Sequence, residues 1–158
     1  MTTPRPRAVD LATGLLLGLL GLAAVTVLLT IVRRDDLILN WAQGHREARE
    51  IVARQGLAYL KAEQPIAIPQ FVPVAIVLAV VVACIVGVLL ALFRIGLAWA
   101  RWSLAGLILV VAICTGAGIR VGAPTAFEVL LWASLALDVA ILVTLFRPSV
   151  HAFVAARD

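Results

Sequence analysis

Four long apolar runs divide the chain, and each is long enough to cross a lipid bilayer. They are Leu11–Val32, Phe71–Phe93, Leu97–Ile119 and Thr125–Phe146. A helix that rises 1.5 Å per residue crosses the roughly 30 Å hydrocarbon core with about 20 residues. The pattern therefore predicts an all-α membrane protein, with residues 1–158 forming a single domain of four transmembrane helices.

The first run has an alternative reading as a signal peptide, because Arg5 and Arg7 precede it. It is longer than the usual signal-peptide core of about 7–15 residues. It also ends at Arg33-Arg34 without an evident small-residue cleavage site. We therefore expect a retained helix.

The segment between the first two runs is dense in charge and has a helical period. Over residues 36–63, apolar side chains fall on one stripe and charged side chains fall opposite. The stripe contains Leu37, Trp41, Gly44, Ala48, Ile51, Val52, Gln55, Tyr59 and Ala62. The opposite face carries Arg46, Glu47, Arg49, Glu50, Arg54 and Lys61. This segregation predicts one amphipathic helix on the membrane surface, ended by the prolines that follow.

Two roles are open for this helix. It can rest on lipid alone, with Trp41 and Tyr59 at the headgroup level. It can instead dock on a partner membrane protein through Trp41, Ile51, Val52 and Tyr59. The near-balanced charge favours docking, since helices that bind only anionic lipid usually carry an excess of Lys and Arg.

Composition agrees with a membrane protein. Hydrophobic residues make up 63% of the chain and charged residues 14%, and the mean hydropathy is +1.09. Ordinary soluble domains carry about 25% charged residues. The net charge of +4 forms no basic face of the size that nucleic acid requires. We expect the surplus cations to face anionic lipids.

Arginines in the short flanks predict the orientation. One side of a four-span topology collects Arg5, Arg7, Arg94, Arg101, Arg147 and Arg157. Only Arg120 lies in the opposite short loop. The positive-inside rule then places both termini in the cytoplasm, for a multi-pass protein of a bacterial plasma membrane. The basic residues between Arg33 and Lys61 argue for the reverse orientation.

Few residues have the chemistry for catalysis. His45 and His151 are separated by three predicted spans, and no His, Cys and carboxylate spacing suits a metal. Cys84 and Cys114 fall inside apolar runs and are expected to be small core residues rather than a disulfide. We expect no catalytic, cofactor-binding or metal-binding residues, no cofactor, and no enzymatic activity of the chain by itself.

Asp138, near the middle of the fourth run, is the exception. An ionised carboxylate there costs at least about 2.5–3.5 kcal/mol on insertion scales, so we expect it to be protonated or paired. In a hairpin that turns near Gly122, Gly106 lies opposite, with Ser103 and Arg101 within reach. Asp138 is either part of a proton or ion relay or a single satisfied polar contact. The second reading is favoured, because relays usually need several such groups.

Gly14, Gly18 and Gly21 give the first run a smooth ridge, on which another helix can approach closely. Packing within the chain explains this ridge as readily as packing against a partner does.

Two short segments carry a family resemblance. They are "GLAWARWSLAGL" (Gly96–Leu107), which opens the third run, and "LFRPSVHAF" (Leu145–Phe153), which closes the fourth. With the four-span pattern, they make the chain similar to small membrane proteins of actinobacteria. It resembles the accessory subunits of the respiratory supercomplex, which joins a cytochrome bcc complex to a cytochrome c oxidase of the haem-copper type.

The resemblance implies a non-catalytic structural subunit of the electron transport chain, attached on the oxidase side. Its partners would be other integral membrane subunits, of the oxidase and the cytochrome bcc complex. Two other functions are open, a small oligomeric transporter or channel that uses Asp138 and a membrane enzyme. A transporter would need more intramembrane polarity than one aspartate.

Overall fold

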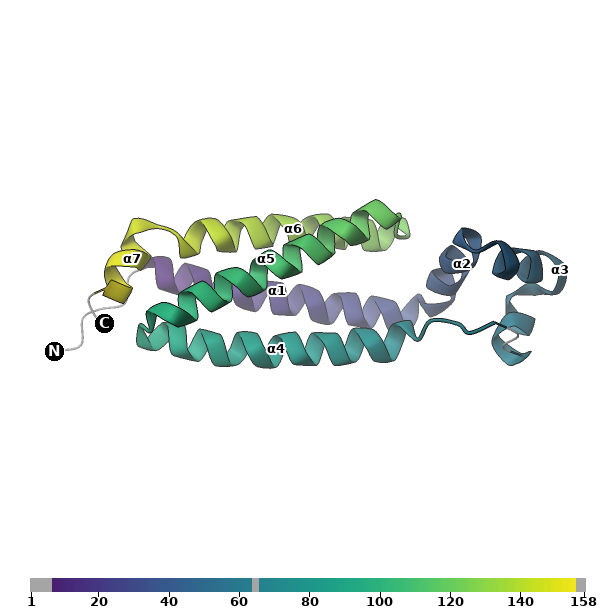
Figure 1. Cartoon of the computed structure of the whole chain (residues 1–158), viewed down its shortest axis with the longest axis horizontal. Coiled ribbons are helices and arrows are strands. Elements are labelled where there is room, and N and C mark those ends of the chain that lie inside the picture. The colour runs from purple at the N-terminus through teal and green to yellow at the C-terminus, as the bar shows by residue number, and fades with distance from the viewer. Residues whose placement is uncertain (1–6, 64–65, 156–158) are drawn as a thin grey trace.

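The computed structural model describes residues 7–63 and 66–155, in which every regular element is an α-helix. The elements are α1 (Arg7–Val32), α2 (Arg34–Gly44), α3 (Arg46–Glu63), α4 (Phe71–Ile95), α5 (Ala98–Val121), α6 (Thr125–Leu145) and α7 (Pro148–Ala155). The long helices α1, α4, α5 and α6 form an elongated bundle (Figure 1). Helices α2 and α3 form a separate unit beyond one end of it, which we call the head.

The four helices of the bundle confirm the four predicted spans. They contain 26, 25, 24 and 21 residues, so at 1.5 Å per residue they are about 32–39 Å long. All four are apolar enough to cross a membrane. Their outer faces carry large apolar side chains that are more than half exposed, such as Leu28, Val77, Val110 and Val129. Because such surfaces are stable in lipid, the chain is a multi-pass membrane protein.

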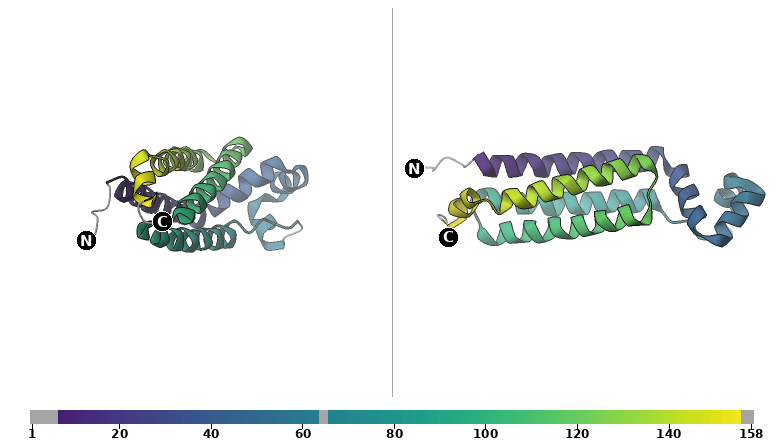
Figure 2. Two further views of the ribbon diagram at one scale, coloured as in Figure 1. Left: turned by 60° about the vertical axis from the view of Figure 1, so that its left-hand side comes forward. Right: turned by 90° about the horizontal axis from the view of Figure 1, so that it is seen from above.

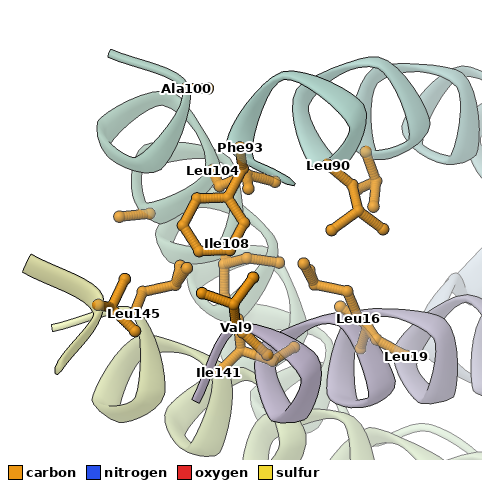
Figure 3. Close-up of a cluster of buried hydrophobic side chains, with 14 of the residues drawn as sticks. Val9, Leu16, Leu19, Leu90, Phe93, Ala100, Leu104, Ile108, Ile141 and Leu145 are labelled. Carbon is orange, nitrogen blue, oxygen red and sulfur yellow. The ribbon is translucent and has the colours of Figure 1, made fainter. Parts of the chain in front are cut away.

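The core of the bundle lies in the half next to α7. Each long helix contributes one stripe of side chains spaced three or four residues apart, as a helix with one buried face requires. The stripes meet at Val9 and Leu16 of α1, Leu90 and Phe93 of α4, Leu104 and Ile108 of α5, and Ile141 and Leu145 of α6 (Figure 3). Cys84 and Cys114 form no disulfide, as expected, but both are exposed on the outside of the bundle rather than in this core.

The link between α4 and α5 is short because Gly96 adopts a left-handed conformation, with φ of 101°. The backbone N–H of Leu97 then reaches Leu92 O at 3.3 Å, and that of Gly96 reaches Phe93 O at 3.0 Å. This is the glycine-dependent ending that satisfies the last carbonyls of a helix. It turns α5 back along the bundle.

The helices do not stay equally close along their length. Helix α5 lies beside α4 at the end near α7 and moves away from it toward the head (Figures 1 and 2). The first half of α4, from Phe71 to Ile85, accordingly contains no fully buried residue. The bundle is therefore tight near α7 and open toward the head.

The head differs from the single amphipathic helix predicted for residues 36–63. A first break occurs at His45, whose extended backbone separates α2 from α3. A second occurs inside α3 at Gly56, with φ of 81° and ψ of 167°, a combination open essentially only to glycine. The apolar stripe predicted across both positions is therefore not continuous. Helix α2 leaves α1 at an angle and α3 turns beside it (Figure 2).

Candidate functional sites

Asp138 lies on the face of α6 that is turned into the bundle. It shares this face with Phe127, Ile141 and Leu145, and its exposed fraction is 0%. Among the residues that the structure describes, neither carboxylate oxygen has a hydrogen-bond partner. At 1.5 Å per residue it lies about 10 Å inside the end of α6 at Leu145. A polar group this deep usually has a partner, so its isolation is unusual.

The neighbours predicted for Asp138 are turned away from it. Ser103 and Gly106 are exposed, because α5 directs Leu104 and Ile108 into the core instead. The register along the hairpin predicts which residues lie at the same depth as Asp138, but it does not specify the rotation of α5 about its axis. That rotation places the small polar side of α5 outside the bundle.

Arg101 is buried, with 6% exposure, near the start of α5. Its guanidinium carbon lies 5.4 Å from the centroid of the Trp102 ring. None of the hydrogen bonds or ion pairs in the described residues joins Arg101 to Asp138. The two intramembrane polar residues singled out in the sequence are thus both buried but are not bonded to each other.

The glycine ridge of α1 faces outward. Gly14, Gly18 and Gly21 are exposed, and a Cβ atom added to any of them would meet nothing within 4 Å. Leu16 and Leu19, on the other side of α1, enter the core. Packing among residues 7–63 and 66–155 therefore does not account for the ridge.

The four head residues predicted for docking have unequal environments. Trp41, Ile51 and Val52 are partly buried, whereas Tyr59 is 39% exposed. The best-buried side chains of the head are Ile38, Ala42, Ala48 and Leu60. Part of the predicted stripe therefore packs inside the head. The break at Gly56 separates Tyr59 from Ile51 and Val52 along the chain.

Polar contacts fix the shape of the head. Lys61 Nζ lies 2.7 Å from Asp35 Oδ1 and returns the end of α3 to the start of α2. His45 Nδ1 donates to Trp41 O at 2.8 Å, and the two rings contact each other at a tilt of 32°, with centroids 4.7 Å apart. His45 therefore has a structural role at the turn. In the part of the chain that the structure describes, no cluster of three His, Cys, Asp or Glu residues could hold a metal ion.

A pair of hollows that no sequence pattern predicted lies where the head meets the bundle. Residues of α1, α2, α4 and α6 surround one, and residues of α2, α3 and the start of α4 surround the other. No local motif marks them, because their walls come from segments far apart in the sequence.

The fold and these sites define the class of the protein, a four-span helical membrane protein with a broken helical head. Comparison of the chain with models of protein families, with curated proteins and with solved structures finds no match.

Proposed function

We propose that the chain is a non-catalytic accessory subunit of a larger membrane complex. The observation that carries the proposal is the outward ridge of Gly14, Gly18 and Gly21 on α1. Small residues in a membrane helix let a second backbone approach closely, and they mark helix–helix interfaces. Each glycine also weakens its own helix by about 1 kcal/mol relative to alanine. A ridge of three is best explained by a helix of another chain.

The head supplies a second contact in this proposal. It lies beyond the end of the bundle, where it can meet the surface of a neighbouring subunit or the lipid headgroups. Tyr59, which is exposed, and Trp41, which is partly buried, offer aromatic contacts that suit such an interface. Ile51 and Val52 are partly buried in α3 and add apolar surface to the head.

The proposed orientation has both termini in the cytoplasm of a bacterial plasma membrane. Four arginines lie at or near the end of the bundle that is opposite the head. They are Arg7, Arg94, Arg101 and Arg147. Their clustering supports this orientation by the positive-inside rule. Arg5 and Arg157 lie outside the described residues.

The partner complex that we propose is the actinobacterial respiratory supercomplex, with attachment on the oxidase side. Support comes from the resemblance of Gly96–Leu107 and Leu145–Phe153. These two segments are neighbours in space, because the rings of Trp102 and Phe146 meet edge to face with centroids 5.4 Å apart. Trp99 and both of these rings are about half exposed, an aromatic surface that suits a protein contact.

The test is purification in mild detergent followed by mass spectrometry of the co-eluting proteins. The parent chain should bring down oxidase and cytochrome bcc subunits in constant ratio. The double variant Gly14→Leu/Gly18→Leu should lose them, because the leucines hold a second helix away. Gly87→Leu is the matched control, since Gly87 is also exposed with nothing within 4 Å but stands apart from the ridge. Recovery of the parent chain only as a homo-oligomer would refute the proposal.

A small oligomeric transporter or channel is the second candidate, favoured by the buried and unbonded carboxyl group of Asp138. The purified chain in proteoliposomes distinguishes the two functions. A proton flux that disappears in Asp138→Asn would support transport. If neither the parent chain nor Asp138→Asn produces a proton flux across the bilayer, the result would support the accessory role.

A further inference from the structure

The first of the two hollows at the junction of head and bundle is an apolar groove of about 320 Å³. Its lining includes Thr30, Leu37, Phe71, Val74, Ala75 and Phe127. Phe127 and Thr30 are buried, while Val74 is 62% exposed at the open side. The groove exists because α5 moves away from α4 toward the head, so that α5 does not cover this part of α4 (Figure 1). In a membrane, a lipid chain would fill it.

The second hollow is a basic recess of about 450 Å³ that adjoins the groove. Arg34 and Lys61 line it, and the two hollows share Pro69, Gln70 and Phe71 as a common wall. Lys61 is paired with Asp35, which does not line the recess. Arg34 has no ion-pair partner among the described residues. Its charge is therefore available to an anion.

The start of α4 adds to the positive potential of the recess. Helix α4 begins at Phe71 in the shared wall, where the N–H groups of Phe71 and Val74 are bonded to Pro69 O and Gln70 O, so that the helix acts through its dipole rather than through free donors. The N-terminus of a long helix carries a partial positive charge and favours anions. The recess thus combines a free guanidinium, an ammonium and a helix N-terminus.

We propose that this junction binds one anionic phospholipid. The headgroup phosphate lies in the recess with Arg34, Lys61 and the start of α4, and an acyl chain lies in the groove between α1, α4 and α6. An arginine binds phosphate with two parallel hydrogen bonds, which makes it the principal headgroup contact. A phospholipid fits both hollows because its glycerol unit joins an anionic phosphate to apolar acyl chains at the level of the membrane surface.

The ligand class follows from having both hollows together. A free phosphate ion would leave the groove empty, and an uncharged lipid would leave Arg34 without a counter-ion. Basic pockets at the ends of membrane helices bind anionic headgroups for this reason. The proposal is independent of the accessory role, because the isolated chain is sufficient to test it.

Two matched pairs of variants separate this site from general attraction to lipid. Arg34→Gln removes the free cation of the recess, whereas Arg33→Gln removes the neighbouring charge, which is paired with Asp36 and does not line the recess. Val74→Trp fills the groove. Val77→Trp adds the same bulk one turn away, at a valine of nearly equal exposure, 61%.

The measurement is native mass spectrometry of the delipidated full chain, titrated with dioleoylphosphatidylglycerol or dioleoylphosphatidylcholine. We expect one molecule of the anionic lipid to bind before any phosphatidylcholine does. Arg34→Gln should weaken it about fivefold, the effect of one basic residue near a lipid headgroup. Val74→Trp should abolish most of the binding, whereas Arg33→Gln and Val77→Trp should bind like the parent.

Three results would overturn the proposal. They are equal binding of the two lipids by the parent chain, equal effects within either matched pair, and competition by glycerol 3-phosphate as strong as that by the whole lipid. Circular dichroism of each variant shows whether the bundle is intact. A variant that fails to fold is replaced by Arg34→Lys or Val74→Phe. The expected loss of lipid binding is smaller in these variants, but it still exceeds that of the matched control.

Discussion

The side-chain amide of Asn40 in α2 donates a hydrogen bond to the carbonyl oxygen of Gly122, at 3.3 Å across 82 positions of the chain. Gly122 ends α5 at the tight turn before α6. The bond therefore connects the head to the hairpin of α5 and α6, which the chain reaches only after two further spans. It is one of the contacts that hold the head on the bundle.

Replacing Asn40 should loosen the head without unfolding the bundle. A hydrogen bond of this kind contributes about 0.5–1.5 kcal/mol, so Asn40→Ala should raise the opening of the head roughly two- to twelvefold. Hydrogen exchange of the amides in α2 and α3 measures this opening. Gln43→Ala, an exposed position on the same helix, should leave the exchange unchanged. Equal exchange in both variants would show that the Asn40 bond does not hold the head.

Gly56→Ala should change the shape of the head. The conformation of Gly56 is strained for any residue with a Cβ atom, at about 1–3 kcal/mol. A straight α3 avoids that strain but carries Lys61 away from Asp35. Spin labels at Gln43 and Ala62, both exposed, should therefore move apart.

The control for this change is Gly44→Ala. Gly44 lies in the last turn of α2, and an added Cβ atom meets nothing within 4 Å. The label distance should stay that of the parent chain, because alanine is the better helix former. An unchanged distance in Gly56→Ala would mean that the bend does not depend on glycine.

Asp138→Val should stabilise the isolated bundle. The variant removes a buried carboxyl group without hydrogen-bond partners, and such a group is destabilising by about 1–3 kcal/mol. The thermal unfolding temperature in detergent should rise. Ile141→Val, on the same face of α6, should lower it, because a lost buried methylene is worth about 0.5–1.5 kcal/mol. A fall in both variants would show that a water molecule or an ion satisfies Asp138.

The orientation is tested with single cysteines at Gln43 in the head and Ser149 in α7, after replacement of Cys84 and Cys114 by alanine. In intact cells, a reagent that cannot cross the membrane should label Gln43→Cys and spare Ser149→Cys. The reverse pattern would invert the orientation. Equal labelling would contradict the four-span topology.

The four spans follow from the sequence alone. A segment that crosses lipid must satisfy its own backbone hydrogen bonds, which a helix does locally, so about 20 consecutive apolar residues are sufficient to define it. Gly96 marks the end of α4 for an equally local reason. The prediction of a single surface helix was wrong because the helical period was extended through Gly56, although a glycine is a local signal for a break.

The tertiary structure alone decided which way each span faces. In water, the apolar face of a helix identifies its buried side, but lipid is as apolar as a protein core, so the pattern within a span carries little information about its rotation. The exposed ridge of Gly14 and Gly18, the outward side of Ser103 and the isolation of Asp138 all depend on that rotation. The groove at Val74 depends in addition on the divergence of α4 and α5, which only the packing of all four spans determines.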